Sequence, residues 1–476
     1  MPQDTRRAAV VIVGAGSAGL AALREVRKRT EDYYLVDSGP LGTTCARVGC
    51  MPSKALIAVA DDLARTRRFA AIGIDGSEHL ACDLPRVLRH VRAERDRYTE
   101  SMVSTTRSAA GERLIIGQAR LDGPQMVCVG DLRIETDAVI LATGAKPMVP
   151  GAWRAFGERV ITSEDIFERE DLPPRLAVIG LGAIGIELGT ALSRLGREVT
   201  GFEMRDTIAG LSDPEVARAA ADTLGAEMPL HLGQAVEIEQ GDDALIVRCE
   251  AAEVRVDAVI AATGVRPAIA DLGLETLGVE LDDHGMPPVD PQALRIGDTG
   301  VFMAGDANGM LPLLHEAADD GYIAGHNALA ERQQDFCRRT PLKLVFSDPQ
   351  IAVAGRSLAE LDRDRIAIGT VDFSDQGRAR LMGRNQGRLA LYIDRDSRRL
   401  RGSEMVAPDA EYLGHLLCQA IDRGLSVDEL LLQPFYHPTI VEGLRTALRH
   451  AADDLGAISE TRSPPICAGS PEAPLT

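Results

Sequence analysis

Val10-Val11-Ile12-Val13-Gly14-Ala15-Gly16-Ser17-Ala18-Gly19 is the stretch that decides the fold. Its apolar start is typical of a buried strand, and the Gly-x-Gly-x-x-Gly pattern then runs into an apolar helical pattern. A second strand, 33–36, ends at an acid. Such glycines let the backbone approach a pyrophosphate at a helix N-terminus, and the acid binds ribose hydroxyls. The pattern predicts a dinucleotide-binding unit that contacts its cofactor through Gly14, Gly16, Gly19 and Asp37.

A second copy of this pattern begins at residue 177. It contains Gly180, Gly182 and Gly185 and ends at Glu203, and both copies span 23 positions from first glycine to acid. The segment 137–147 (DAVILATGAKP) also matches the segment 257–267 (DAVIAATGVRP). The chain is therefore internally duplicated, with each Ala-Thr-Gly turn expected beside a nucleotide. The first copy is 46 residues longer than the second, which marks it as the copy that carries the chemistry.

The extra residues contain Cys45-Ala46-Arg47-Val48-Gly49-Cys50. On a regular helix, residues five apart lie about 8–9 Å apart at Cα, whereas a disulfide needs about 4.4–6.8 Å. A bridge therefore needs a distorted segment, which Gly49 permits. Pro52 suits the first turn of a following helix, whose positive end would favour a thiolate at Cys50. We predict a redox disulfide rather than buried thiols or zinc ligands, and no metal site.

Composition limits the class of protein. The chain has 476 residues, enough for about three domains, and its 45% apolar and 26% charged residues are typical of a globular protein. A net charge of −19 argues against nucleic acid or anionic membrane as a partner. No stretch is long and apolar enough to span a membrane. Eight cysteines at this length do not indicate a secreted scaffold, so we expect a cytoplasmic protein.

The acid of each copy bears on the choice of nucleotide. Glu203 would repel a 2′-phosphate, so NAD is expected in the second site, although Arg205 lies close enough to leave NADP open. Thiol chemistry moves two electrons, and a flavin lets a hydride donor reduce a disulfide. FAD is therefore expected in the first site, where the residues alone would also allow NAD.

Taken together, these motifs resemble the pyridine nucleotide–disulfide oxidoreductases, and among them most of all the dihydrolipoamide dehydrogenases. The resemblance covers nearly the whole chain in order. Besides both fingerprints and both Ala-Thr-Gly turns, it includes the segments 42–54, 299–306, 313–317, 346–351 and 437–442.

The resemblance implies roles for these residues. Cys50 would be the thiol nearest the flavin and Cys45 the one that exchanges with substrate. Lys54 and Glu187 would pair near the flavin and the nicotinamide. His437, oriented by Glu442, would be the general acid/base for the thiols, contributed by the partner subunit of a homodimer. The remaining cofactor contacts would come from Thr44, Thr143, Gly144, Gly264, Asp306 and His315.

The residues around His437 agree with this role. Pro438 suits a first helical turn and would place His437 at a helix start. An imidazole titrates near neutral pH and can move a thiol proton, while a carboxylate can hold its tautomer. A plain His-Pro helix start is the alternative.

The redox segment departs from the family pattern. Thr43 stands where dihydrolipoamide dehydrogenases have a glycine, and Ala46-Arg47 replace Leu-Asn. Arg47 puts a permanent charge beside the disulfide, which would lower a thiol pKa, favour an anionic substrate or simply face solvent.

Several functions follow from the resemblance. The first is NAD-dependent oxidation of dihydrolipoamide, free or on a lipoyl carrier protein. The alternatives are NAD(P)H-dependent reduction of another disulfide or of mercuric ion, and a non-catalytic nucleotide-binding redox sensor. Mercuric reductases carry a Cys pair near the C-terminus, where this chain has only Cys467.

The expected fold class is α/β, with two Rossmann-like domains for FAD and NAD and a C-terminal α+β dimerisation domain. We predict an FAD domain over 1–150, an NAD domain over 151–275, a segment completing the FAD site over 276–343, an interface domain over 344–460 and a loose tail over 461–476.

Overall fold

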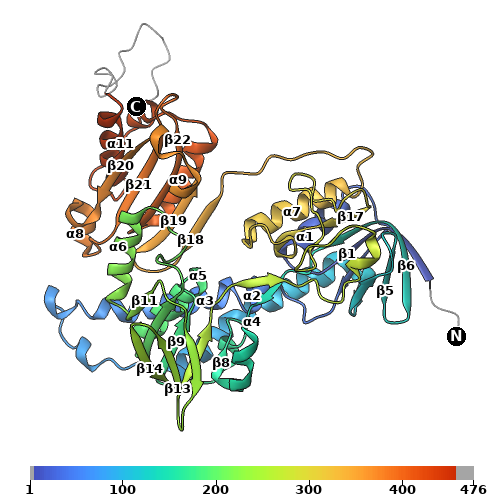
Figure 1. Cartoon of the computed structure of the whole chain (residues 1–476), viewed down its shortest axis with the longest axis horizontal. Coiled ribbons are helices and arrows are strands. Elements are labelled where there is room, and N and C mark those ends of the chain that lie inside the picture. The colour runs from blue at the N-terminus through green and yellow to red at the C-terminus, as the bar shows by residue number, and fades with distance from the viewer. Residues whose placement is uncertain (1–4, 457–476) are drawn as a thin grey trace, which may run out of the picture. The chain divides into compact units, whose positions relative to one another are not determined.

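The computed structural model describes residues 5–456, which form two compact units (Figure 1). Of the described residues, the first unit holds 5–173 together with 258–338. The second holds 174–257 together with 339–456. The chain thus passes between the units three times, as expected for a nucleotide domain inserted within another. The predicted tail and Cys467 lie outside the described residues.

The first unit is built on a mixed sheet in the order β3-β2-β1-β6-β5-β4, with β17 also paired to β6. The central strands are parallel, and Ile12 of β1 lies between Leu35 of β2 and Ile140 of β6. All three of these side chains are fully buried. The strands are β1 (Thr5–Val13), β2 (Tyr33–Asp37), β3 (Leu114–Ile116), β4 (Ala119–Leu121), β5 (Met126–Val129), β6 (Leu132–Leu141) and β17 (Val301–Met303).

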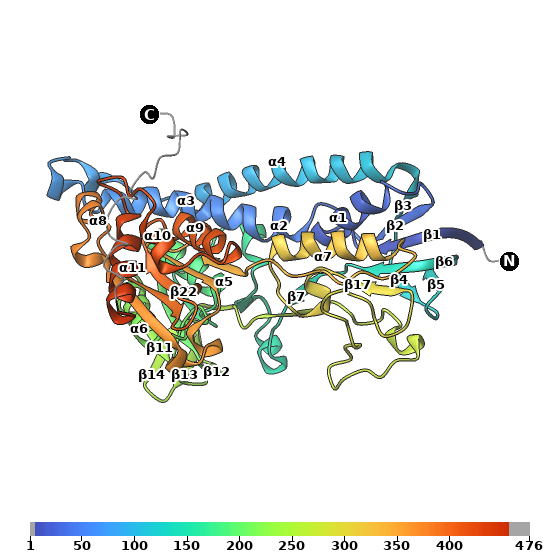
Figure 2. The ribbon, with the colours of Figure 1, turned by 90° about the horizontal axis from the view of Figure 1, so that it is seen from above.

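Helices α1 (Ser17–Val26) and α7 (Leu314–Asn327) lie side by side in this unit (Figures 1 and 2). A Cβ added at Gly321 would lie 2.1 Å from the backbone oxygen of Ala18. Glycine therefore allows the two helix backbones to approach closely. This packing brings α7, which is distant in sequence, against the helix that starts at the first glycine loop.

The longer first copy holds three α-helices between β2 and β3. They are α2 (Thr44–Arg47), α3 (Cys50–Thr66) and α4 (Leu84–Ala110), and α3 and α4 run side by side in Figure 2. At the start of α4 the Asp83 carboxylate accepts the Arg86 N–H at 3.0 Å, a capping contact that satisfies one free donor. Four short strands complete the unit: β7 (Ala145–Pro147), β8 (Val160–Ile161), β15 (Ala258–Ala261) and β16 (Val265–Pro267).

The second unit opens with the other predicted nucleotide-binding copy. Its parallel strands follow the order β11-β10-β9, and Gly201 of β10 lies between Val178 of β9 and Leu230 of β11. The elements are β9 (Arg175–Ile179), α5 (Ala183–Arg194), β10 (Glu198–Glu203), α6 (Pro214–Gly225), β11 (Leu230–Leu232) and the antiparallel β12 (Glu237–Gln240), β13 (Leu245–Cys249) and β14 (Ala252–Val256).

The same unit ends in an antiparallel sheet of order β18-β19-β22-β21-β20. Helix α9 packs against β19 and β22, and α11 packs against β20 and β21, around a shared apolar core. The predicted fold class is therefore confirmed. The elements are β18 (Leu342–Val345), β19 (Gln350–Gly355), β20 (Ile366–Asp372), α8 (Gly377–Met382), β21 (Arg388–Asp394), β22 (Leu400–Ala407), α9 (Ala410–Asp422), α10 (Val427–Leu431) and α11 (Glu442–Asp454).

A fully buried carboxylate, Glu404 on β22, joins this sheet to the nucleotide-binding part of the unit. It accepts the N–H of Ser212 at 2.6 Å and of Asp213 at 3.1 Å, just before α6, and the N–H of Leu358 at 2.8 Å. The Ser212 hydroxyl donates to it at 2.5 Å. Buried polar groups are tolerated when hydrogen-bonded, and here one carboxylate satisfies three backbone donors.

No helix within residues 5–456 is both long enough and apolar enough to cross a membrane.

We predict that Glu404→Gln destabilises the second unit by about 1–3 kcal/mol. The amide can turn only one oxygen toward these donors, so at least one buried N–H loses its acceptor. Thermal unfolding should show a midpoint lowered by about 2–4 °C for each kcal/mol. Glu237→Gln, at an exposed site on β12, is the matched control and should leave the midpoint unchanged. Equal midpoints for both variants would contradict the prediction.

Candidate active site

Cys45 and Cys50 form a disulfide with a Cα–Cα distance of 4.7 Å. They meet because the helix is interrupted: α2 ends at Arg47, and α3 begins at Cys50. A Cβ on Gly49 would lie 3.1 Å from the Thr44 oxygen and 3.3 Å from the Cys45 Cα, so glycine permits the close approach. The predicted distortion is present, and so is the helix predicted to follow it.

Cys50 is the first residue of the 17-residue helix α3. The free N–H groups and the dipole at a helix start favour negative charge, so this position stabilises a thiolate more than Cys45 does. One turn later on α3 lies the half-buried Lys54, whose Nζ is 3.5 Å from the Ser53 hydroxyl. That hydroxyl donates to the Cys50 oxygen at 3.1 Å.

Thr43, which precedes the disulfide, has an unusual backbone. Its φ of 27° lies in the region that favours glycine, at the position where the family pattern has glycine. Such a conformation costs a side-chain-bearing residue about 1–3 kcal/mol. The Thr43 hydroxyl accepts the Ala46 N–H at 3.2 Å and caps α2. Such a cap stabilises a helix by about 1 kcal/mol, which offsets part of the cost of the backbone conformation. Compared with glycine, Thr43 is strained at this φ, but its side chain caps the short helix that carries Cys45.

The side chain of Arg47, at the end of α2, is half-buried. Within residues 5–456 no hydrogen bond or ion pair engages its guanidinium. Thr44, on the same helix, is exposed.

The first glycine loop has the shape that a dinucleotide requires. A Cβ on Gly14 would lie 2.2 Å from the Ala142 oxygen, and one on Gly19 would lie 1.8 Å from the Gly14 oxygen. A Cβ on Gly16 would meet nothing, which leaves open space at the start of α1. The Asp37 carboxylate accepts the Ala15 N–H at 2.6 Å and so ties the loop to the end of β2.

The second loop repeats this arrangement. Gly182 has φ −74° and ψ −169°, against −77° and −170° for Gly16. The Glu203 carboxylate accepts the Leu181 N–H at 2.7 Å, as Asp37 does in the first copy. Its other oxygen accepts the Arg205 N–H at 3.1 Å. Gly180 precedes this loop and Gly185 lies in α5. The duplication seen in sequence is therefore a duplication of backbone conformation.

The two Ala-Thr-Gly turns pair with each other through β7 and β16, with Lys146 opposite Arg266. Their glycines, Gly144 and Gly264, have φ of 72° and 106°, which glycine adopts without strain. The Thr143 hydroxyl beside them is buried and has no hydrogen-bond partner in residues 5–456. An unpaired buried hydroxyl next to the first glycine loop fits a site that a bound cofactor completes.

Asp306 and His315 follow β17 in the first unit. Asp306 lies in a 3-10 turn (Gly305–Asn308), and burial raises the pKa of its carboxyl, with a further contribution from Asp320. His315 is exposed near the start of α7.

Sequence reasoning missed Asp320 and Arg338, which hold this turn in place. Asp320 is buried and accepts the Gly305 N–H at 2.9 Å and the Asn308 amide at 2.6 Å. Its other oxygen pairs with Arg338. The sequence does contain an indication of this role. Glu316 and Asp320 are acids one helical turn apart, so they share a helix face, and the residue that follows each of them is buried.

Glu187 is buried on α5 and accepts the Phe346 N–H at 3.0 Å. It thereby connects two predicted motifs of the second unit, the glycine-loop helix and the segment 346–351. Its pairing with Lys54 stays a prediction.

The His437 Nδ1 lies 3.0 Å from a Glu442 oxygen. Glu442 also accepts the Thr439 N–H at 3.2 Å and pairs with Arg445 at 2.8 Å. The imidazole side chain is 81% exposed, which leaves its other nitrogen accessible. The predicted dyad is therefore formed within one chain.

The expected helix start at Pro438 is wrong. Helix α11 begins at Glu442, and the His437–Pro438 peptide bond is cis. A proline has a fixed φ and no N–H, which suits a bend as well as a first helical turn, so the sequence did not separate the two. The bend still places His437 beside Glu442.

The remaining described cysteines, at positions 82, 128, 249, 337 and 418, form no disulfide. Burial raises the pKa of the Cys418 thiol to about 11, which makes it inert at neutral pH. No group of three or more metal-ligating side chains gathers within residues 5–456.

Comparison with known proteins decides the family. Residues 8–321 match the pyridine nucleotide-disulphide oxidoreductase family, and residues 342–448 match its dimerisation domain. The chain belongs to the pyridine nucleotide-disulphide oxidoreductases. It is thus an oxidoreductase and a flavoprotein with a disulfide redox centre, and members of its family use FAD and NAD(P).

Three relatives illustrate the range within this family. The oxidoreductase is 31% identical to a dihydrolipoyl dehydrogenase of Thermus scotoductus over 92% of this chain and 96% of that protein. It is 29% identical to a mercuric reductase of Acidithiobacillus ferrooxidans over 98% of this chain and 85% of that protein. The HOCl-induced flavoprotein disulfide reductase RclA of Escherichia coli shares its fold, with a TM-score of 0.81 at 24% identity over 93% of this chain and 99% of that one.

The residues of this oxidoreductase fit both cofactors. The loop of Gly14, Gly16 and Gly19, the Thr143 hydroxyl and Asp306 would hold FAD, and the loop before α5 with Glu203 would hold the nicotinamide nucleotide. The pKa of Glu442, which contacts His437, is lowered, first by the Thr439 N–H, then by the hydrogen bond and charge of His437 and by Arg445.

We predict that the stabilising effect of the Glu442 carboxylate depends on pH. Because its folded pKa lies below the ordinary 4.5, the contribution is complete above that value and is lost as pH falls through the folded pKa. Glu442→Gln should therefore melt below the unsubstituted protein at pH 7, and the two midpoints should converge once the pH falls below the folded pKa of Glu442. Glu237→Gln should show no such convergence. A Glu442→Gln difference that stays constant with pH would refute the charge-based explanation.

Proposed function

We propose that this oxidoreductase is an NAD-dependent dihydrolipoyl dehydrogenase, which oxidises dihydrolipoamide, free or on a lipoyl carrier protein. The observation that carries the proposal is the Cys45–Cys50 disulfide at the start of α3, in the insertion that follows the FAD-type loop. Relatives named dihydrolipoyl dehydrogenase, about 30% identical over most of the chain, support this substrate.

The protein's own residues would carry the thiol exchange. A substrate thiolate attacks the Cys45 sulfur, the Cys45–Cys50 bond breaks, and Cys50 leaves as a thiolate that the start of α3 stabilises. The second substrate thiol then attacks the substrate sulfur of the mixed disulfide and releases Cys45. The substrate leaves oxidised, with one disulfide formed, and the enzyme holds a dithiol.

His437 would accept the proton of the attacking substrate thiol at the ring nitrogen that Glu442 does not contact. Glu442 holds the Nδ1–H tautomer, and Thr439 and Arg445 in turn hold Glu442. FAD supplies the two-electron transfer from the enzyme dithiol to NAD⁺, so that the net reaction converts a dithiol and NAD⁺ into a disulfide, NADH and H⁺. Lys54 and Glu187 would pair with each other near the flavin and the nicotinamide.

The dimerisation domain at 342–448 supports a homodimer. In that assembly each His437 would serve the disulfide of the other subunit.

Glu203 supports NAD over NADP. Its carboxylate is fixed at the end of β10 by two backbone N–H groups, where it would bind the ribose hydroxyls and repel a 2′-phosphate.

Reduction of another disulfide or of mercuric ion with NAD(P)H is a second candidate, favoured by the mercuric reductase among the relatives. The lone Cys467, where mercuric reductases carry a pair, argues against the mercuric reading. A non-catalytic redox sensor is disfavoured by the intact disulfide and the formed His437–Glu442 dyad.

The test is anaerobic turnover of the purified flavoprotein with dihydrolipoamide and NAD⁺, beside glutathione disulfide with NADH and with NADPH. We expect rapid NAD⁺-linked oxidation of dihydrolipoamide that Cys45→Ser abolishes. Cys249→Ser removes a free thiol outside the redox centre and should retain activity. If NADH reduces the flavin but the protein does not turn over dihydrolipoamide, the proposed substrate is wrong, and the assignment as a flavin-dependent disulfide oxidoreductase is retained.

We further predict that Arg47 favours anionic dithiols. Within the part of the chain that the structure describes, its guanidinium makes no hydrogen bond or ion pair, so a substrate carboxylate can approach it, and a solvent-accessible ion pair is worth about 1 kcal/mol. The ratio of kcat/KM for dihydrolipoate over dihydrolipoamide should fall about fivefold in Arg47→Ala. Arg47→Lys keeps the charge and should keep the ratio. An unchanged ratio in Arg47→Ala would show that this side chain only faces solvent.

A further inference from the structure

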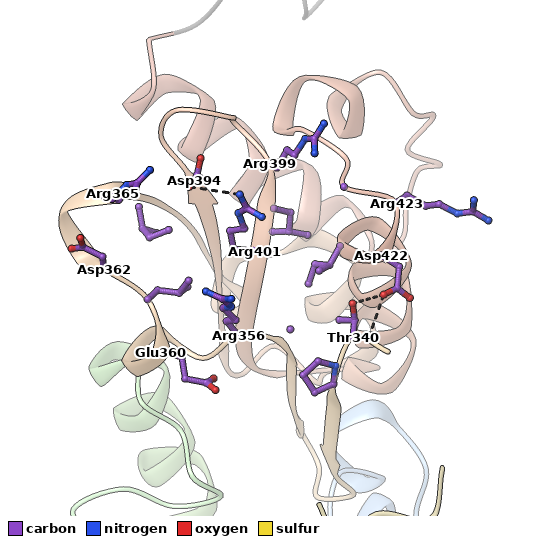
Figure 3. A pocket seen from close by; sticks show the side chains of 17 residues that line it. Thr340, Arg356, Glu360, Asp362, Arg365, Asp394, Arg399, Arg401, Asp422 and Arg423 are labelled. Atoms are coloured by element: carbon purple, nitrogen blue, oxygen red, sulfur yellow. Dashed lines mark hydrogen bonds and ion pairs between the residues drawn. The ribbon is translucent and has the colours of Figure 1, made fainter. Parts of the chain in front are cut away.

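A cavity of about 720 Å³ opens at one end of the C-terminal sheet in the second unit (Figure 3). Its walls come from the start of β18, the end of β19 with the turns that follow it, the β21–β22 hairpin and the end of α9. Neither the redox residues nor the nucleotide-binding residues line it. Its volume lies within the range of about 300–1,000 Å³ typical of small-molecule sites.

Five arginines from four separate segments line this cavity: Arg356, Arg365, Arg399, Arg401 and Arg423. Two of them are cross-strand neighbours, because the Arg356 N–H donates to the Arg401 oxygen at 3.1 Å where β19 and β22 meet. A Cβ on Gly402 would lie 1.8 Å from the Arg356 oxygen, so glycine lets these strands approach. Like charges on neighbouring strands destabilise a sheet unless something neutralises them.

The carboxylates of the cavity are already engaged by other donors. Glu360 accepts the Ser357 N–H and hydroxyl at 2.8 and 2.7 Å, and Asp394 accepts those of Ser397 at 2.8 and 2.6 Å. Asp422 likewise accepts from the N–H and hydroxyl of Thr340. Each of these three acids accepts from a backbone N–H and a hydroxyl of its own neighbourhood, although Asp394 also lies 3.9 Å from Arg401. The fourth acid of the lining, Asp362, accepts the Asp364 N–H at 3.2 Å.

The positive charges of these arginines are only partly balanced by ion pairs with carboxylates. Arg401 reaches Asp394 only at 3.9 Å, and Arg365 pairs with Asp396 on the rim at 2.8 Å. Within residues 5–456 the guanidinium groups of Arg356, Arg399 and Arg423 make no ion pair. In a chain of net charge −19, this is a local concentration of fork-shaped donors that match phosphate oxygens in pairs.

We propose that this cavity is a binding site for a small phosphate-bearing metabolite. Arg356 and Arg401 grip the phosphate from neighbouring segments of the sheet. Leu361, Ile366 and Ile421 supply apolar wall for the organic part of the ligand. The inference goes beyond the proposed redox function and does not depend on it.

The test is calorimetric titration of the full-length flavoprotein with inorganic pyrophosphate, in low-salt buffer. Saturating NAD⁺ is present so that the glycine loop of the nicotinamide site is occupied. We expect one site per subunit and a Kd that weakens with added salt. The double variant R356Q/R401Q should weaken binding about tenfold or more, because it removes both charge-assisted contacts.

The matched control is R363Q/R378Q, which removes two exposed arginines of the same unit that do not line the cavity. It changes the net charge equally and should keep the Kd of the unsubstituted protein. Should the double variant fail to fold, Arg356→Gln and Arg401→Gln are tested singly. Absence of pyrophosphate binding, equal weakening in the control, or tighter binding of citrate than of pyrophosphate would each overturn the phosphate site.

Discussion

A hydrogen bond from a glycine-loop N–H to a carboxylate at the end of the next strand underlies both nucleotide folds. Ala15 donates to Asp37 and Leu181 donates to Glu203, at 2.6 and 2.7 Å. In each copy this contact fixes the loop against the sheet edge where parallel strands end, and it leaves the helix N-terminus facing open space. The same carboxylate then stands where a ribose would be bound. The fold and the cofactor sites are thus set by the same local contact, made twice.

The redox centre depends on a different constraint, namely that two sulfurs five residues apart cannot meet on a continuous helix. The break at Val48 and Gly49 solves this and also makes Cys50 the first residue of α3. One local irregularity therefore both closes the disulfide and gives its two sulfurs unequal surroundings. Thr43 adds a second irregularity, a positive φ stabilised by its own hydroxyl. The charge of Arg47 then distinguishes this redox segment from the Leu-Asn pattern with which the sequence was compared.

Buried carboxylates do much of the joining between segments distant in sequence. Asp320 organises the turn that carries Asp306, Glu187 holds the backbone of Phe346, and Glu404 binds three backbone donors from two loops. Each lies on a regular helix or strand, where an acid usually indicates a solvent-facing position. Their partners are backbone N–H groups, which leave no pattern in a sequence. For that reason only Glu187, which belongs to a family motif, was singled out beforehand.

The sequence by itself determined the duplicated nucleotide fold, the glycine and acid positions, the disulfide and the helix that follows it. The loop-to-acid hydrogen bonds join residues 22 positions apart and the disulfide joins residues five apart, so spacing and residue type are sufficient to identify these features. The bend at Pro438, the pairing of the two Ala-Thr-Gly turns, the buried carboxylate network and the arginine-lined cavity were decided only by tertiary structure. The last three bring together segments whose separation along the chain carries no information about their distance in space, whereas the bend at Pro438 is local. Proline fits a bend and a helix start equally well, and the five arginines are unremarkable until β19, β22 and α9 converge.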